Sequence, residues 1–225
     1  MDFKNAKELL DFCQKLNCPI SDIMKQRECT LAETSLEDIY AKMDHALSIM
    51  RESASSPIQE PKKSIGGLIG GEARLADLHR ARGAAICGSV LSRAITYSMA
   101  VLETNTSMGL IVAAPTAGSC GIMPGCLLTL MEDKGMARKD VVMSMFTAAA
   151  FGMVIAKNAC IAGAQGGCQA ECGSAAGMTA AAMVELSGGT PSQCADACAV
   201  AIANQLGLVC DPVAGLVEIP CVKRN

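Results

Sequence analysis

The chain has 225 residues, which suits one large domain, with or without a small appendage, and is long enough to bury a substantial core. Hydrophobic residues make up 51% of it, yet aromatic residues only 3% and there is no Trp, so we expect tightly packed helices with small side chains. The net charge of −3, without a basic run, argues against a nucleic-acid partner.

The cysteine content indicates a reducing environment. There are 13 cysteines, an odd number, and the opening MDFKNAKELL has no charged-then-apolar signal pattern. A secreted disulfide scaffold would be shorter and more polar. The longest apolar stretches, such as residues 145–156, are shorter than the ~20 residues of a membrane span. We therefore expect a cytoplasmic protein without a membrane-spanning helix.

The composition changes abruptly near residue 64. Residues 1–63 carry 20 of the 41 charged residues and no Gly, whereas the rest carries all 21 Gly and 10 of the 13 Cys. We predict a charged helical segment at 1–52, a Ser- and Pro-rich linker at 53–64 and a main domain at 65–225. In the first segment, Ser35 followed by Asp38 is typical of a helix start. An apolar stripe follows at spacings of three and four, formed by Leu36, Ile39, Tyr40, Met43, Leu47 and Met50.

The main domain alternates Ala- and Met-rich runs with Gly-rich breaks. The runs at 76–103, 139–162, 174–186 and 192–206 are long enough for helices, and β-branched alternation is weak. We predict an all-α fold: a compact helical domain whose Gly- and Pro-rich loops form a site, preceded by the small charged segment.

Two Gly-rich segments stand out as possible anion sites. Residues 114–125 hold three Gly and two Pro together with Thr116 and Ser119, and residues 64–72 are similar. Such segments present backbone N–H groups and hydroxyls to an anion, but they equally suit tight connections between helices. Neither matches a phosphate-binding loop, because no Gly-Lys-Ser/Thr follows, so a nucleotide site is disfavoured.

Three cysteines lie in unusual surroundings. Cys168 follows Gly-Gly, whereas Cys210 and Cys221 adjoin Pro at one or two positions, so we expect all three in loops that point thiolates inward. Thiolates of this kind hold iron–sulfur clusters, and three of them leave one iron open. Spacing alone is a weak signal for a cluster and favours buried core thiols, which are common. Core packing is the favoured interpretation for the i,i+4 pairs, which are Cys168/Cys172 and Cys194/Cys198.

Histidine chemistry is poorly supported. Only His45 and His79 exist, and there is no Gly-x-Ser-x-Gly elbow, so a Ser-His-Asp or Cys-His hydrolase is disfavoured.

Three motifs together resemble a known family. Residues 115–121 (PTAGSCG), 163–171 (GAQGGCQAE) and 210–225 (CDPVAG and IPCVKRN) are similar to the alpha chain of iron–sulfur-dependent L-serine dehydratase, an L-serine ammonia-lyase that does not use pyridoxal phosphate. The resemblance is strong over 64–225 and looser before it. It implies an all-α catalytic domain in which Cys168, Cys210 and Cys221 ligate a [4Fe-4S] cluster.

The resemblance also implies a partner. In some members a beta chain is separate and in others it is fused ahead of this region, so we expect a separate beta chain and a hetero-oligomer. Family members continue beyond the IPCVKRN motif, so we interpret this sequence as possibly truncated at Asn225. Cys172 stands where a small apolar residue is expected.

The implied reaction converts L-serine to pyruvate and ammonia, with the open iron as Lewis acid on the hydroxyl. Our candidates for holding the substrate are Thr116, Ser119 and the amides of Gly118 and Gly121, followed by Asn105, Lys157 and Asn158. Gln169 and Glu171 are expected to orient the cluster. The base is His79 or a residue of the beta chain.

Two other functions stay open at this point. One is a related cluster-dependent lyase acting on threonine or cysteine. The other is a non-catalytic metal-binding or interaction subunit, in which Cys194 and Cys198 would matter as much as Cys168.

Overall fold

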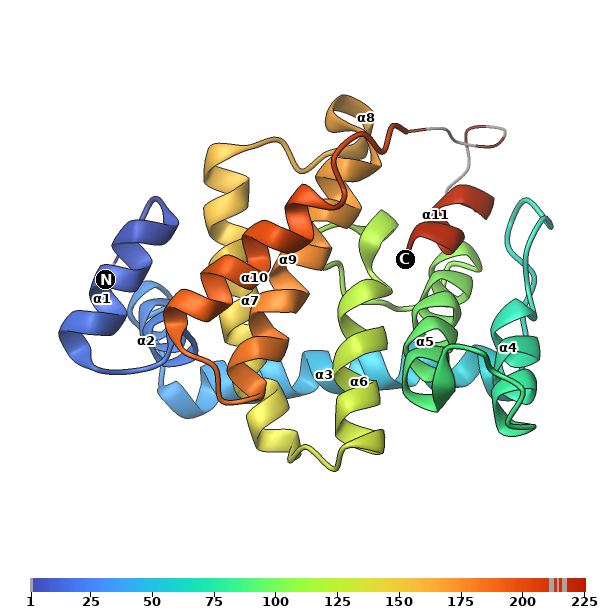
Figure 1. Cartoon of the computed structure of the whole chain (residues 1–225), viewed down its shortest axis with the longest axis horizontal. Coiled ribbons are helices and arrows are strands. Elements are labelled where there is room, and N and C mark those ends of the chain that lie inside the picture. The colour runs from blue at the N-terminus through green and yellow to red at the C-terminus, as the bar shows by residue number, and fades with distance from the viewer. Residues whose placement is uncertain (1, 211–212, 214, 216–217) are drawn as a thin grey trace. The chain divides into compact units, whose positions relative to one another are not determined.

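The protein is built from helices (Figure 1). The computed structural model describes residues 2–210, 213, 215 and 218–225, and this part of the chain contains no β-strand. The predicted all-α fold is thus confirmed. The helices are α1 (Ala6–Leu16), α2 (Ile20–Leu31), α3 (Leu36–Gln59), α4 (Glu72–Ala81), α5 (Gly88–Thr106), the short 3₁₀ helix η1 (Ala117–Ser119), α6 (Ile122–Asp133), α7 (Arg138–Asn158), α8 (Gly163–Gly166), α9 (Cys168–Leu186), α10 (Pro191–Ala203) and α11 (Ile219–Arg224).

The chain forms two compact units, each made of two separated segments. Unit 1 comprises Met1–Ala46 and Ala137–Leu208, and unit 2 comprises Leu47–Met136 and Val209–Asn225. The predicted linker at 53–64 is helical as far as Gln59, and both units combine residues from either side of it. The division of the chain into an N-terminal segment, a linker and a main domain at residues 52 and 64 stays a prediction.

The charged N-terminal segment contains α1, α2 and α3. The predicted start of α3 is confirmed: the Asp38 amide donates to Ser35 Oγ at 3.0 Å, and Ser35 Oγ donates to the Asp38 carboxylate at 2.8 Å. This pairing satisfies one of the backbone N–H groups that every helix start leaves without an intrahelical acceptor. Along the predicted stripe, Ile39, Leu47 and Met50 are buried.

In unit 1, α9 packs against both α7 and α10, and α2 packs against α7. Small residues make the close α9–α10 contact possible. A Cβ at Gly177 would lie 3.0 Å from Cys198 Sγ and 2.9 Å from Ile202 Cγ1. A larger residue at position 177 would therefore push α10 away from α9.

Helix α7 corrects one expectation from the sequence. Its 21 residues make it long and apolar enough to cross a membrane by length and composition, although the apolar runs were predicted to be too short. The reason is that Val141, Val142 and Met143 extend the apolar character ahead of residue 145. Half of its most apolar window is buried inside unit 1, where α2 and α9 cover it, so core packing accounts for this composition.

In unit 2, α5 is the central helix and contacts α4, α6 and α11. The predicted helical run at 76–103 is divided into α4 and α5. Gly83 adopts φ of +70° directly after α4, and Gly88 adopts φ of +79° at the start of α5. These left-handed conformations favour glycine, and they interrupt the helical run between α4 and α5.

A buried carboxylate fixes the start of α4. Glu103 of α5 is 2% exposed and accepts hydrogen bonds from the amides of Gly71 at 3.1 Å and Ala73 at 2.7 Å. Burial raises the pKa of Glu103, and the neighbouring Glu72 carboxylate acts in the same direction, while the two amides oppose the shift. Ionised Glu103 is therefore less favourable in the folded protein than in the unfolded chain.

This shift makes stability depend on pH. Below the unfolded pKa, Glu103 is protonated in both states and has no effect, whereas stability falls as the pH rises through the raised folded pKa. We expect the free energy of unfolding of Glu103→Gln, relative to that of the wild type, to increase over this pH range. Denaturant titrations of both proteins at a series of pH values measure it. A difference that is constant with pH would contradict the assignment.

Candidate functional site

Cys168 is the first residue of α9 and is 3% exposed. The expectation that it lies in a loop is wrong, because the chain turns at Gly167, with φ of +76°, and enters the helix immediately. The Gly-Gly pair before Cys168 does mark an unusual backbone conformation, because only a glycine readily adopts the one found at Gly167.

Gln169 anchors the segment that leads to Cys210. Its backbone amide donates to the Leu208 carbonyl at 2.9 Å, and its side-chain Oε1 accepts from the Gly207 amide at 2.9 Å. Leu208 precedes Cys210 by two positions, so Gln169 ties the chain just ahead of Cys210 to the helical turn that begins with Cys168. Glu171, in the same turn, has its carboxyl group against Gly163 of α8, where a Cβ would lie 2.5 Å from Oε2.

Cys210 and Cys221 belong to unit 2. Cys210 lies in irregular backbone, as predicted, but its side chain is exposed, so the expectation that it points inward is wrong. The Arg224 guanidinium donates to the carbonyl of the preceding Val209 at 2.9 Å. Cys221 is half-buried inside α11, so the expectation of a loop is wrong there. Pro220 caused this error. Proline interrupts a helix interior but is favoured in the first turn, where its missing N–H has no acceptor.

The Gly-rich segment after the predicted linker holds the start of α11. Glu218, directly before α11, is 2% exposed. Its carboxylate accepts from Ser64 Oγ at 2.8 Å, from the Gly66 amide at 2.9 Å and from the Leu68 amide at 3.2 Å. Residues 64–72 thus present N–H and hydroxyl groups to an anion, which is one of the two interpretations that the sequence left open, and the anion in this structure is Glu218.

The second Gly-rich segment holds the end of α11. Asn225 Nδ2 donates to the carbonyls of Gly118 and Cys221, both at 2.9 Å, and Asn225 Oδ1 accepts from the Gly121 amide at 3.0 Å. One carboxamide thus joins the predicted substrate loop to the helix that carries Cys221. The predicted role of the Gly118 and Gly121 amides toward a substrate stays a prediction.

The 115–121 loop has a defined shape. Thr116 Oγ1 and Ser119 Oγ share a hydrogen bond of 3.2 Å, and Ser119 is fully buried. Asn105 Nδ2 of α5 donates to the Ala117 carbonyl at 3.0 Å. Asn105 therefore supports this loop through its backbone, and the half-exposed Thr116 is the hydroxyl better placed to meet a ligand.

Three other predicted residues belong to helices α7 and α4. Lys157 of α7, in unit 1, donates to Asp2 Oδ1 at 3.1 Å and to the Phe3 carbonyl at 2.9 Å, and the neighbouring Asn158 donates to the Lys4 carbonyl at 2.7 Å. Both side chains hold the N-terminal segment. His79 is exposed on α4 in unit 2.

The remaining helical cysteine pair behaves as core. Cys194 is fully buried and Cys198 is 5% exposed. Burial raises the pKa of the Cys194 thiol to about 12 and that of Cys198 to about 11. Both thiols are therefore protonated near neutral pH, which disfavours them as metal ligands.

The sequence analysis missed Glu218 and Asn225. The available signals in the sequence were an acid ahead of a Pro-containing segment and an Asn at the end of the IPCVKRN motif. Neither identifies a partner, because their partners lie about 150 and 100 positions earlier in the chain.

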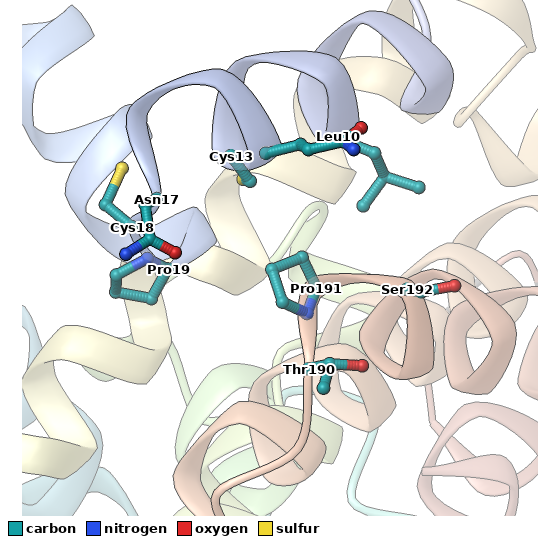
Figure 2. Close-up of a pocket in the computed structure, with 9 residues that line it drawn as sticks. Leu10, Cys13, Asn17, Cys18, Pro19, Thr190, Pro191 and Ser192 are labelled. Carbon is teal, nitrogen blue, oxygen red and sulfur yellow. The ribbon is translucent and has the colours of Figure 1, made fainter.

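Unit 1 also contains a cavity. It has a volume of about 590 Å³ and is lined by residues of α1 and of the start of α10. Figure 2 shows Cys13 and Asn17 on one side of it and Thr190, Pro191 and Ser192 on the other. None of the predicted site residues lines this cavity.

Comparison with known proteins identifies the family. The profile of the serine dehydratase alpha chain matches residues 15–225. This chain belongs to that family. It is 48% identical over 223 residues to the probable L-serine dehydratase alpha chain of Bacillus subtilis, covering 99% of this chain and 74% of the relative. It is 41% identical over 220 residues to the L-serine dehydratase alpha chain of Peptoniphilus asaccharolyticus, covering 98% and 75%. The L-serine dehydratase of Helicobacter pylori is 34% identical over 233 residues, and this chain covers half of it.

The three motif cysteines of this family member fit an iron–sulfur group by their chemistry. No cysteine in the described residues forms a disulfide. Cys168 and Cys221 lie in the first turns of helices, and the segments that carry all three are anchored by Gln169, Arg224, Glu218 and Asn225. Within the part of the chain that the structure describes, no three His, Cys, Asp or Glu side chains are grouped around one ion; Cys168 is in unit 1, and Cys210 and Cys221 are in unit 2.

Burial predicts how fast the thiols react. At pH 8, we expect iodoacetamide to modify the exposed Cys87, Cys160 and Cys210 first. Cys194 and Cys198 should stay unmodified until the protein unfolds, because burial excludes the reagent and keeps them protonated. Peptide mass spectrometry over time measures the rates, with a denatured sample as control. Modification of Cys194 as fast as Cys160 would contradict its assignment to the core.

Proposed function

We propose that this chain, together with a separate beta chain, is the catalytic alpha subunit of an L-serine dehydratase that converts L-serine to pyruvate and ammonia. The observation that carries the proposal is the similarity of nearly the whole chain to proteins named L-serine dehydratase alpha chain. The alpha-chain name of these relatives is also the ground for proposing a beta chain and a hetero-oligomer. The content of 13 cysteines, an odd number, is the ground for proposing a cytoplasmic location.

Cys168, Cys210 and Cys221 are the proposed ligands of a [4Fe-4S] cluster. Three protein thiolates leave one iron of such a cluster without a protein ligand. When bound, the cluster supplies a Lewis acid for the serine hydroxyl, which is otherwise a poor leaving group. Gln169 orients this site through its bonds to Gly207 and Leu208, and Glu171 shapes the same turn against Gly163.

The 115–121 loop is the proposed binding place for the substrate carboxylate. Thr116 and the Gly118 amide are half-exposed there, whereas Ser119 is buried and fixes Thr116 through their shared hydrogen bond. Hydrogen-bond donors at a substrate carboxylate stabilise the negative charge that develops on it when the α-proton leaves. Asn105 keeps the loop in place through Ala117.

The elimination needs a base for the α-proton. Removal of that proton and loss of water give 2-aminoacrylate, which tautomerises to an imine, and water hydrolyses the imine to pyruvate and ammonia. The proposed base is His79 or a residue of the beta chain. The exposed position of His79 on α4 leaves its imidazole accessible to a partner. Lys157 is held at the N-terminus and is better explained as structural.

Cysteine substitutions test the cluster assignment. We expect Cys168→Ala, Cys210→Ala and Cys221→Ala each to lose the bound iron and to reduce serine-dependent pyruvate formation to background. Cys194→Ala should keep both, and should lower the free energy of unfolding by about 1–2 kcal/mol through the loss of a buried thiol. Iron analysis after anaerobic reconstitution and a coupled pyruvate assay with the beta chain provide the measurements.

The same variants separate the proposal from a metal-storing subunit. In that alternative, Cys194→Ala and Cys168→Ala would lose iron to a similar extent, and no variant would affect turnover. Iron loss confined to the three motif cysteines excludes it.

The substrate is tested by its products. Pyruvate from serine, 2-oxobutyrate from threonine and sulfide from cysteine are measured in parallel, over a range of concentrations of each substrate. We expect the largest kcat/KM for serine, unchanged by a carbonyl reagent that inactivates pyridoxal phosphate. Faster formation of 2-oxobutyrate or sulfide would assign the chain to a related lyase.

A further inference from the structure

Helix α11 is too short to fix its own orientation. It has six residues, from Ile219 to Arg224, and helices of this length are not stable in isolation. Its only deeply buried apolar side chain is Val222, 6% exposed. Polar contacts at its two ends must therefore determine where the Cys221 thiol lies.

The contact at the start of α11 is a buried carboxylate in a backbone cradle. Glu218 receives one hydroxyl and two amide hydrogen bonds from the 64–68 segment, all between 2.8 and 3.2 Å. The segment is itself closed, because the Ser64 amide donates to the Ile69 carbonyl at 2.9 Å and the Ile65 amide donates to the Thr106 carbonyl of α5 at 3.0 Å. These bonds, which do not involve Glu218, fix the cradle to α5.

The contact at the end of α11 is the Asn225 carboxamide. It bonds to Gly118 and Gly121 of the loop and to the Cys221 carbonyl. Asn105 fixes the same loop to α5. Both ends of α11 are therefore held by segments that α5 anchors, and Cys221 lies between the two points of attachment.

We infer that Glu218 and Asn225 are positioning residues, which fix the Cys221 thiol by holding α11 at both ends against the two Gly-rich segments. Because Asn225 bonds to the proposed substrate loop and to Cys221 at the same time, a shift of that loop reaches the cysteine through one side chain. The catalytic meaning of this inference rests on the proposed function. The geometry of α11 is independent of that proposal.

Two nearly isosteric variants remove these contacts selectively. Glu218→Gln removes the negative charge and replaces one acceptor oxygen with an NH₂ group, which opposes a donor. Asn225→Asp keeps an acceptor for the Gly121 amide but loses both Nδ2 hydrogen bonds. Thr104→Val is the matched control, because it removes a side-chain hydrogen bond to the Ser53 carbonyl, 2.8 Å long, in the same unit but away from α11.

The first readout needs neither cluster nor activity. In the cluster-free full chain, we expect Glu218→Gln and Asn225→Asp to raise the rate of Cys221 alkylation about tenfold, as expected for losing one hydrogen bond with a charged or well-ordered partner. The rate at exposed Cys160 of unit 1 should stay the same, and Thr104→Val should alkylate as the wild type does. If Cys221 in both variants is alkylated at the wild-type rate, the inference is overturned.

The second readout uses the reconstituted protein with its beta chain. We expect both variants to release iron to a chelator about tenfold faster than the wild type, and to lower kcat more than they raise KM. Thr104→Val should match the wild type in both respects at a similar melting temperature. A wild type that binds no cluster would refute the proposed function, and the alkylation rates would still decide the inference about α11. Equal iron release from wild type and variants would contradict the positioning role.

Discussion

The close approach of Gly121 and Gly125 to the backbone of α5 is the constraint on which unit 2 depends. A Cβ at Gly125 would lie 2.7 Å from the Ala94 carbonyl oxygen and against Ser98 Oγ, and one at Gly121 would lie against the Ser98 carbonyl. Side chains cannot occupy these positions without separating α6 from α5. The 115–121 loop therefore lies directly on α5, within reach of Asn105.

Polar groups, rather than apolar side chains, determine the arrangement around α4 and α11 in unit 2. Glu103, Glu218 and Asn225 each join a helix or helix end to backbone amides of a Gly-rich segment. Backbone amides have fixed directions, so these bonds specify position more closely than apolar contacts do. They also cost more to break, because a buried acceptor without a donor is unfavourable. A site that must hold a cysteine in one place is well served by such contacts.

The sequence was sufficient to predict much of this arrangement and insufficient for the rest. Helical periodicity and the scarcity of β-branched alternation predicted the all-α fold, and the Ser35–Asp38 pair predicted the start of α3. Glycine and proline marked the unusual cysteines correctly but indicated the wrong local structure, because Gly167 and Pro220 begin helices instead of preventing them. The partners of Glu218 and Asn225 depend on contacts between distant segments, which local patterns do not encode. Lys157 looked available for chemistry and instead holds the N-terminal segment.

We propose that this chain carries an iron–sulfur cluster with one iron open to L-serine. Mössbauer spectra of the chain, reconstituted anaerobically with iron and sulfide and combined with its beta chain, test it most directly when recorded with and without L-serine. The account predicts a [4Fe-4S] cluster in which the signal of one iron moves when serine is added. A cluster whose irons all keep their signals at saturating serine, while pyruvate is formed, would contradict it.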